Sequence, residues 1–442
     1  IIIIQDAMNN KFSGEALFEF IGSTPTPFHA AAHILRILKN AGYTVLSENE
    51  KWHIDQAGKY VVVRNGSVIA FTTGEGNFSQ SGFRIAGAHT DSPSLQLKPH
   101  PRSPMSPYFQ FSVEKYGGVL LNTWFDRELS LAGRVTVLTE TGAASSCLID
   151  FQEPVLYIPS LAIHLDRKAN EGKEINAQSD ICPILAQSVS SEDQWQALLL
   201  ERLNTANKDL AASSVLGYDL FCYDCSPPRY FGLDHKFICG PRLDNLLSCF
   251  IALQALLNRE GPSNCMLIFT NHEEIGSTSS SGALSNFADS VLSRICSAVE
   301  DKAIALNRSF FISFDNAHAS HPNFPDRSDS DHQIVLNKGP VIKINSAQRY
   351  CSNSRSGAIF KLLCSEIGVE TQDFIMRSDM ACGSTIGPLT SAELGVEGVD
   401  VGVPTWAMHS IREVTGAMDP EFIYLAAHHF FNRTTLPVIT DR

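Results

Sequence analysis

The sequence lacks the features that would place this protein on nucleic acid or in a membrane. Among its 442 residues there is no run of the roughly 18–20 uncharged apolar residues that a membrane-spanning helix needs. There is also no cluster of lysine and arginine, and the formal net charge is −13. Nucleic acids and anionic membranes favour a basic surface. We therefore expect neither nucleic acid nor a membrane as a partner.

The start of the chain and its cysteines both bear on where the protein resides. Ile1–Ile4 is too short for the apolar core of a signal peptide, and no basic segment precedes it. We interpret these isoleucines as foreign to the natural chain and Met8 as its native start. The 11 cysteines are odd in number, and most lie in apolar surroundings, as Cys249 and Cys265 do. This usage is typical of a reducing compartment, so we expect the cytoplasm.

The composition and the order of patterns predict a protein of more than one domain. Hydrophobic residues make up 44% of the chain, which is enough for a large core. Helix-like segments such as Phe28–Ala41 and strand-like segments such as Cys265–Thr270 alternate towards both ends, whereas the middle is rich in proline and strand-like pieces. We infer an α/β core split over residues 8–97 and 237–442, with residues 98–236 inserted as a second domain.

Groups that can bind a metal follow five strand-like segments of the inferred core. These are Phe83–Gly87 with His89 and Asp91, Phe237–Cys239 with Asp244, Cys265–Thr270 with Glu273 and Glu274, Phe310–Phe314 with Asp315, and Val399–Val403 with His409. In open α/β sheets the carboxyl ends of the strands form the crevice where ligands bind. Two histidines and three or more carboxylates suit zinc, cobalt or manganese and exceed what one structural metal needs. The pattern therefore predicts a two-metal catalytic centre.

Each of these residues also has an ordinary structural explanation. A lone histidine after a strand is usually a hydrogen-bonded polar residue, Asp244 can cap the next helix, and Asp315 is typical of a turn. These explanations do not account for the position of all of them at one edge of one inferred sheet. Asp91, two residues after His89, could accept the second ring N–H of that histidine and fix its tautomer.

The adjacent pair Glu273–Glu274 lies where a buried-looking strand stops. A metal would neutralise Glu274 as a ligand, while Glu273 could take a proton from an activated water and return it to the leaving amine. The surrounding TNHEEIGST is not H-E-x-x-H, so the signature of the helical single-zinc proteases is absent. This absence favours the two-metal interpretation.

Motifs along nearly the whole chain resemble those of the aspartyl aminopeptidase family of metallo-aminopeptidases. They include GAHTDSPSL (87–95), PRLDNLLS (241–248), HEEIGS (272–277), GPVIKINSAQRY (339–350) and AMHSIRE (407–413). The segment NEGKEINAQ (170–178) resembles the bacterial branch of the family. The resemblance implies a zinc-exopeptidase-like α/β/α sandwich with an inserted β-rich dimerisation domain. It also implies hydrolysis of peptides with N-terminal Asp or Glu.

The resemblance further implies a role for each metal-capable group. Two Zn²⁺ ions are implied, with Co²⁺ or Mn²⁺ as possible occupants of one site. One ion would be bound by His89, Asp244 and Asp315, and the other by the bridging Asp244 with Glu274 and His409. Glu273 would be the general base and Asp91 the residue that orients His89. The implied assembly is a homo-oligomer in which dimers build a dodecamer.

His164 has more than one interpretation. A count of histidines alone would make it a zinc ligand together with His89 and His409, but it belongs to the inserted segment. The resemblance implies instead that it is a substrate-binding group contributed across a subunit interface. The remaining alternative is a polar residue packed in a strand.

Lys343 is the group expected to recognise an acidic residue. A chain with a charge of −13 cannot attract an acidic peptide end by its overall field, so selectivity requires a local cation. Lys343 lies in VIKIN, a run that otherwise looks buried, and a substrate carboxylate would be a suitable partner. A lysine that reaches solvent from an edge strand is the alternative. His318 is the expected helper, with the same resemblance behind it.

Two other classes of function fit parts of this pattern. A related two-metal amide hydrolase, such as a deacetylase or a carboxypeptidase, would keep the ligands and change the specificity groups. A non-catalytic carrier would be expected to lose Glu273 or a ligand, and the sequence retains the full set.

Overall fold

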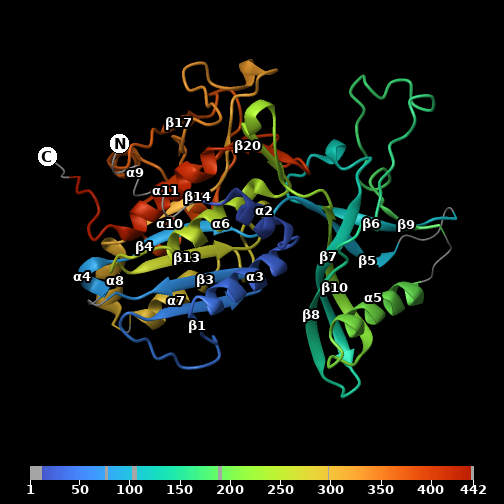
Figure 1. The fold of residues 1–442 in the computed structure, drawn as a ribbon, viewed down its shortest axis with the longest axis horizontal. Coiled ribbons are helices and arrows are strands. Elements are labelled where there is room, and N and C mark those ends of the chain that lie inside the picture. The colour runs from blue at the N-terminus through green and yellow to red at the C-terminus, as the bar shows by residue number, and fades with distance from the viewer. Residues whose placement is uncertain (1–11, 75–77, 102–106, 188–191, 297, 440–442) are drawn as a thin grey trace.

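Figure 1 shows a larger lobe built from both ends of the chain and a smaller lobe built from its middle. The computed structural model describes residues 12–74, 78–101, 107–187, 192–296 and 298–439. The interpretation of Ile1–Ile4 and Met8 therefore lies outside the described residues. In the described part of the chain, no helix is long and apolar enough to cross a membrane.

The larger lobe is organised around a nine-stranded mixed sheet. In spatial order its strands are β1 (Thr44–Val45), β2 (Lys59–Arg64), β3 (Ser67–Thr72), β13 (Cys265–Thr270), β4 (Arg84–His89), β14 (Phe310–Phe314), β18 (Gly398–Gly402), β16 (Val341–Ile344) and β17 (Gln372–Ile375). The adjacent strands β13, β4, β14 and β18 run parallel to one another. Their carboxyl ends therefore meet at one edge of the sheet, where ligands bind in folds of this class.

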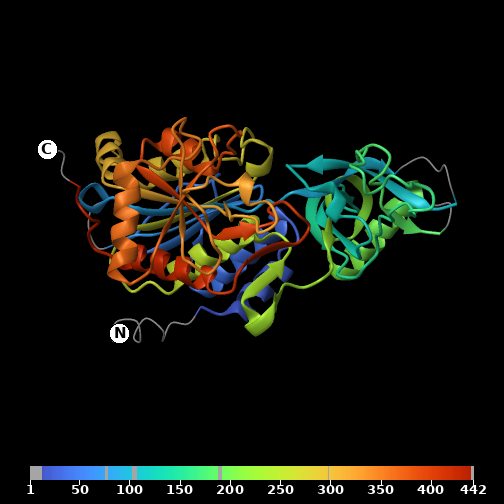
Figure 2. The same ribbon diagram turned by 90° about the horizontal axis from the view of Figure 1, so that it is seen from above.

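Helices cover both faces of this sheet and make an α/β/α sandwich (Figure 2). One face is covered by α2 (Gly14–Gly22), α3 (Pro27–Asn40), α6 (Leu243–Leu257), α9 (Ser354–Glu366) and α11 (Asp419–Asn432). The other face is covered by α4 (Phe78–Ser81), α7 (Phe287–Ile295), α8 (Val299–Asn307) and α10 (Ile386–Leu394). Because both faces are covered, a strand such as β13 is apolar from Cys265 to Phe269 and all its residues are buried.

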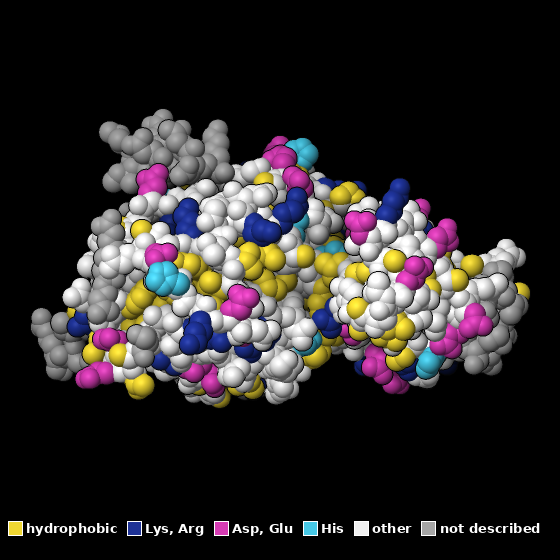
Figure 3. Space-filling view, turned by 90° about the horizontal axis from the view of Figure 1, so that it is seen from below, with side chains coloured by type: hydrophobic (Ala, Val, Ile, Leu, Met, Phe, Trp, Pro, Cys, Tyr) yellow, Lys and Arg dark blue, Asp and Glu magenta, His cyan; other side chains and the backbone are white. Residues whose placement is uncertain are grey.

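The smaller lobe contains a six-stranded antiparallel sheet and one long helix. The strands, in spatial order, are β8 (Ala144–Asp150), β7 (Leu129–Thr139), β10 (Ala212–Asp224), β5 (Ser94–Pro101), β6 (Phe109–Tyr116) and β9 (Ile184–Ala186). Helix α5 (Glu192–Ala206) buries Trp195, Leu199 and Leu203 against this sheet, at the four-residue spacing of one helix face. Hydrophobic side chains gather at the junction of the two lobes, as Figure 3 shows.

A third, five-stranded sheet lies in the larger lobe and corrects one expectation. Its order is β11 (Arg229–Phe231), β12 (Phe237–Gly240), β20 (Glu413–Gly416), β19 (Pro404–Trp406) and β15 (Ala317–His318). The prediction that Phe237–Cys239 is a strand of the core sheet is therefore wrong, because this segment pairs with β11 and β20. A short apolar strand shows no sign in its sequence of which sheet it will join.

The predicted fold class, an α/β sandwich split in sequence around a β-rich insertion, is confirmed by this architecture. The strands of the six-stranded sheet come from residues between Ser94 and Asp224. The domain boundaries proposed above, at residues 98 and 236, stay a prediction.

Candidate metal centre

The carboxyl ends of the four adjacent parallel strands bring most of the expected groups together. His89 is the last residue of β4, and Asp315 directly follows β14. Glu273 and Glu274 begin a short 3₁₀ turn (Glu273–Ile275) just after β13. Asp244 arrives from the irregular first turn of α6 rather than from a strand of this sheet.

Among the residues that the structure describes, three groups of side chains could each hold a metal ion, with ligand atoms within 4.8 Å of one another. They are His89 with Asp244 and Asp315, Asp244 with Glu274 and His409, and His89 with Glu273 and Glu274. The first two groups share Asp244, whose oxygens point in different directions. Its Oδ1 lies 3.3 Å from His89 Nε2, and its Oδ2 lies 3.7 Å from His409 Nε2. Asp244 thus offers one oxygen towards each of these two groups.

Buried polar atoms indicate that this centre needs cations. Asp244 Oδ1 is buried, and among the described residues its 3.3 Å contact with His89 Nε2 does not have hydrogen-bond geometry. Burial, with the neighbouring carboxylates, raises the pKa of Glu273 to about 8. Burial and nearby Asp244 also raise the pKa of Asp315 to about 6, although Lys343 opposes this. Carboxylates crowded in this way are stabilised by bound metal ions, so the donor set fits the divalent zinc that the sequence predicted.

Asp91 does more than the sequence predicted. Its main-chain carbonyl lies 3.0 Å from His89 Nδ1, closer than its carboxylate, which is 3.4 Å away. The carboxylate instead accepts the main-chain N–H groups of Glu273 (3.1 Å to Oδ1) and Glu274 (3.1 Å to Oδ2). Its Oδ2 also accepts the hydroxyl of Tyr116 over 2.9 Å. Asp91 therefore holds the turn that carries the two glutamates.

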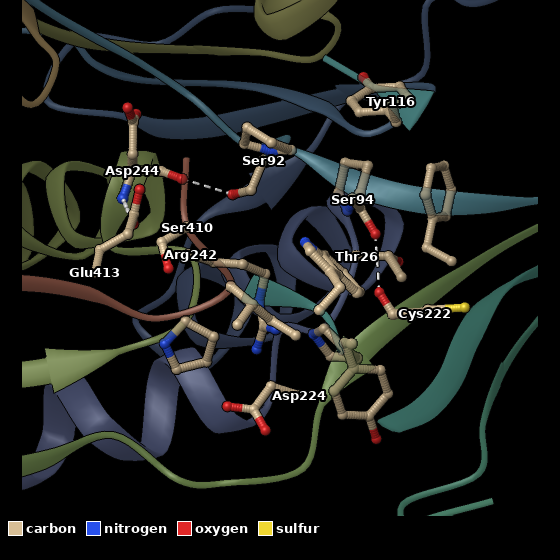
Figure 4. Close-up of a pocket in the computed structure, with 18 of the residues that line it drawn as sticks. Thr26, Ser92, Ser94, Tyr116, Cys222, Asp224, Arg242, Asp244, Ser410 and Glu413 are labelled. Atoms are coloured by element: carbon tan, nitrogen blue, oxygen red, sulfur yellow. Dashed lines mark hydrogen bonds between the residues drawn. The ribbon is translucent and has the colours of Figure 1, made fainter. Parts of the chain in front are cut away.

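Glu413 and Ser92 are site residues to which the sequence interpretation gave no role. Both carboxylate oxygens of Glu413 accept main-chain N–H groups, from Asp244 and from His409, each over 2.8 Å. Ser92 Oγ donates to the carbonyl of Asp244 over 2.7 Å, as Figure 4 shows. The only signal in the sequence was their position, Ser92 next to Asp91 and Glu413 at the end of the AMHSIRE motif.

The smaller lobe also contacts the metal centre, through the segment that follows β6. A Cβ on Gly118 would lie 2.9 Å from His409 Nδ1, and a Cβ on Gly117, whose φ is +72°, would lie 3.0 Å from Glu274. The Gly118 carbonyl is 3.2 Å from His409 Nδ1. A proton on Nδ1 would therefore be shared with this carbonyl, which leaves Nε2 free to bind a metal.

The five expected metal ligands of the larger lobe and Glu273 line a cleft of about 120 Å³ together with two of the three predicted substrate groups, Lys343 and His318. Lys343 is 3% exposed, and its Nζ lies 3.6 Å from Asp315 Oδ2. Its strand β16 lies between β18 and β17, so the alternative of a solvent-reaching lysine on an edge strand is wrong. Desolvation, with the nearby Lys343 ammonium, lowers the pKa of His318 to about 4.

His164 is not brought to the metal centre within one chain. It lies on an exposed turn of the smaller lobe and is not among the described residues that line the cleft. Three large apolar side chains around it are also exposed, Leu161 (52%), Ile163 (45%) and Leu165 (75%).

Comparisons with known proteins agree with the chemistry of this centre. The family model for the aminopeptidase I zinc metalloproteases (M18) matches residues 20–431. The chain is 48% identical over 425 residues to a probable M18 family aminopeptidase 2 of Stutzerimonas stutzeri, covering 96% of this chain and 99% of that protein. It is 47% identical over 424 residues to the protein of the same description in Pseudomonas aeruginosa strain PAO1, with 96% and 99% covered.

Solved structures show the same fold. A chain in the cryo-EM structure of the Ape4 and Nbr1 complex superposes with a TM-score of 0.92 at 35% identity, covering 97% of this chain and 86% of that one. The S. cerevisiae mApe1 dodecamer superposes with a TM-score of 0.81 at 26% identity, covering 95% and 96%. The similarity spans both lobes, so the β-rich insertion is part of the shared fold.

Proposed function

The chain belongs to the aminopeptidase I zinc metalloprotease (M18) family, and we propose that it is an aspartyl aminopeptidase of the bacterial branch. In this proposal it removes N-terminal Asp or Glu from small peptides with two Zn²⁺ ions, one of which Co²⁺ or Mn²⁺ can replace. The observation that carries the acidic preference is a buried ammonium, Lys343, in the same cleft as the predicted metal ligands.

The ligand set that we propose follows the two groups that share Asp244. His89, Asp244 and Asp315 hold one ion, and Asp244, Glu274 and His409 hold the other. When bound, the ions polarise the scissile carbonyl and make water a better nucleophile at neutral pH. The separate directions of the two Asp244 oxygens support this arrangement.

Glu273 is the proposed general base. Its Oε2 lies 3.9 Å from His89 Nε2, so it faces the metal centre. It accepts a proton from the attacking water and returns that proton to the departing amine. Asp91 accepts the main-chain N–H of Glu273 and so holds the segment from which the Glu273 carboxylate extends.

Lys343 and His318 are the proposed partners of the acidic substrate side chain. An ammonium has three donors, so Lys343 can bind a substrate carboxylate while it remains near Asp315. Low exposure strengthens this charge pair relative to one on the surface. A second cavity of about 290 Å³ adjoins the cleft, because His318 and Met408 line both. This cavity leaves room for the rest of the peptide.

The assembly that we propose is a dodecamer built from dimers, with residues 98–236 as the dimerisation domain and His164 acting on the site of a partner subunit. The exposed apolar residues Leu161, Ile163 and Leu165 beside His164 support an interface at this turn. The S. cerevisiae relative is described as a dodecamer. The proposed location is the cytoplasm, in keeping with the 11 free thiols.

A panel of peptides tests the proposed function. The zinc-loaded protein is incubated with peptides that differ only in the first residue, which is Asp, Glu, Leu or Lys, and free amino acids are measured. We expect release of Asp and Glu well above Leu and Lys, and no release from an N-acetylated Asp peptide. Equal release of all four residues would reject the acidic preference while leaving the aminopeptidase activity. Release from the acetylated peptide would reject an aminopeptidase.

A further inference from the structure

Glu413 is a buried carboxylate that joins two of the proposed metal ligands. It is the first residue of β20 and is 1% exposed. Its Oε2 accepts the main-chain N–H of Asp244 over 2.8 Å, and its Oε1 accepts that of His409, also over 2.8 Å. One side chain therefore connects two ligand-bearing segments that are distant in the sequence.

Both segments have backbone conformations that persist only when contacts with other parts of the chain hold them. His409 has a φ of 67°, and Arg242, two residues before Asp244, has a φ of 55°. Residues with a Cβ seldom adopt this left-handed region and keep it only where surrounding contacts hold them. Asp244 itself is not helical, with φ −82° and ψ 106°, although it lies in the first turn of α6. A fixed acceptor for each N–H supplies such a contact.

The Glu413 carboxylate lies behind the metal centre rather than in the cleft. It lines a small cavity of about 30 Å³ that Asp244 also lines, and Figure 4 shows it beside the backbone of that residue. Glu413 is not among the described residues that line the cleft. Since both of its oxygens accept main-chain N–H groups, its geometry suits support of the ligands and not metal binding.

The neighbouring residue ties this segment to the smaller lobe. Arg412 forms an ion pair with Asp224 of β10, with 2.8 Å between Nη1 and Oδ2, and both side chains are buried. Arg412 also donates to the carbonyls of Ser226 and Pro227, over 2.7 and 3.0 Å. These contacts hold the main chain next to Glu413. They therefore hold the position from which the Glu413 carboxylate reaches Asp244 and His409.

We propose that Glu413 is a positioning residue for the second metal position: it sets the separation of Asp244 and His409 through their main chains. The proposal rests on the ligand set of the proposed function, and it adds a residue to which neither the motifs nor the comparisons assign a role. Asp91 holds Glu273 and Glu274 in the same way. Residues that orient metal ligands typically change metal affinity about 10–100-fold when replaced.

Two variants separate position from charge. Glu413→Gln keeps the shape but turns one acceptor oxygen into an amide donor that faces a main-chain N–H. Glu413→Asp keeps the negative charge but is one methylene shorter and cannot reach both N–H groups. Asp419→Asn is the matched control, because Asp419 is 0% exposed and accepts the main-chain N–H groups of Asn337 (2.7 Å) and Gly339 (3.4 Å).

Three measurements are made on each full-length protein. The first is the rate at which bound zinc passes to excess chelator, the second is the visible spectrum of the Co²⁺-loaded protein, and the third is the melting temperature of the metal-free protein. We expect both Glu413 variants to release one of the two zinc ions about 10–100 times faster, with an altered Co²⁺ spectrum. Asp419→Asn should lower the melting temperature and leave zinc release and the spectrum unchanged.

Other outcomes would overturn the proposal. Zinc release and Co²⁺ spectra like those of the wild type in both variants would show that Glu413 does not position the ligands. Full recovery in Glu413→Asp would show that charge alone matters. A wild type that binds no metal would reject the ligand set and this role together. If the wild-type protein binds two zinc ions but releases no amino acids, the proposed function is rejected. The zinc-release rates of the variants then still decide whether Glu413 positions the ligands.

Discussion

The hydroxyl of Tyr116 donates a hydrogen bond to the carboxylate of Asp91 over 2.9 Å, and both side chains are buried. Tyr116 is the last residue of β6 in the smaller lobe, whereas Asp91 follows β4 in the larger one. The same Asp91 oxygen accepts the main-chain N–H of Glu274, and the other oxygen accepts that of Glu273. The smaller lobe is therefore coupled directly to the turn that carries the two glutamates.

Tyr116→Phe should weaken that coupling. The change removes one hydrogen bond to a buried charged group, so Asp91 is less firmly held and the Glu273 carboxylate is less well placed. We expect kcat to fall about tenfold with KM little changed, since a hydrogen bond to a charged group contributes roughly that factor. Steady-state kinetics on an N-terminal Asp peptide measure both. Tyr218→Phe is the control, because the Tyr218 hydroxyl donates to main-chain carbonyls of Lys98 and Pro99 within the smaller lobe. Similar kinetics in both variants would contradict the coupling.

Glu273→Gln should separate catalysis from metal binding. Glutamine has the same shape but cannot accept the proton of the attacking water, so we expect turnover to fall by about 10²-fold or more. Metal content should stay near two ions per chain by elemental analysis. Glu274→Ala and His409→Ala should instead lose metal, because each removes a proposed ligand. Near-normal turnover in a metal-loaded Glu273→Gln protein would reject the general base, and two retained metals in both alanine variants would reject the ligand set.

Which parts of this site the sequence could predict depends on how each residue is held. His89, Glu273 and Asp315 lie at the ends of strands, and the pattern of a buried run followed by a polar group marked them. Asp244 was correctly expected near the others, but for a reason that is partly wrong. It is delivered by the first turn of α6 after β12, a strand of another sheet.

The supporting contacts were beyond the reach of a single sequence. Glu413 and Asp91 act through their carboxylate oxygens on main-chain N–H groups, and any residue except proline offers such a group. The sequence therefore does not reveal which residue donates its main-chain N–H to such a carboxylate. The sequence gives Tyr116 no expected role, because its contact with Asp91 depends on how the two lobes pack. Pairings between distant segments of this kind are fixed by tertiary structure alone.

Removal of metal should make stability depend on pH. In the folded metal-free protein, the pKa of Glu273 is raised from 4.5 to about 8 and that of Asp315 from 3.8 to about 6. The folded state thus binds more protons than the unfolded state in this range, so the free energy of unfolding falls as the pH rises from about 5 to 8. His89, whose pKa is also raised, acts in the same direction.

Zinc should largely remove this dependence, because bound metal replaces the protons. Melting temperatures from pH 5 to 8, with zinc or with a chelator, measure the effect. Asp419 also has a pKa raised to about 7, but it lies away from the predicted ligands and contributes to both curves. The gap between the zinc-loaded and metal-free curves should therefore widen as the pH rises. Parallel curves would contradict the assignment of these carboxylates to a metal centre.

His164→Phe should lose activity while it keeps both metals and the oligomer. His164 is exposed and is not among the described residues that line the cleft of its own chain, so its effect on catalysis requires another subunit. Mixed oligomers of His164→Phe and Glu273→Gln chains should regain part of the activity, because some sites then combine an intact Glu273 with an intact His164. Activity is compared with that of each variant alone at equal oligomer concentration. No recovery in verified mixed oligomers would place the role of His164 within one chain or in the structure of the turn.

Lys343→Met should change substrate preference more than overall activity. The substitution removes the ammonium in the cleft but keeps a long apolar side chain, so an acidic substrate residue loses its charged hydrogen bond. We expect kcat/KM on an N-terminal Asp peptide to fall about 10–100 times further than on the matched Leu peptide, the range for a hydrogen bond to a charged group. Lys361→Met is the control, since Lys361 pairs with Asp373 on the surface.

The decisive quantity is kcat/KM on the Asp peptide divided by kcat/KM on the Leu peptide. This is because Lys343 Nζ also lies 3.6 Å from Asp315, a proposed zinc ligand. Loss of that contact would change metal binding and affect the turnover of both peptides equally, so it cancels in the ratio. Lys343→Arg adds a second test, because arginine retains the positive charge. If this charge binds the substrate carboxylate, the arginine variant should keep most of the preference for Asp. An equal loss on Asp and Leu peptides in Lys343→Met would assign Lys343 to the support of Asp315, and the acidic preference would then need a different cation.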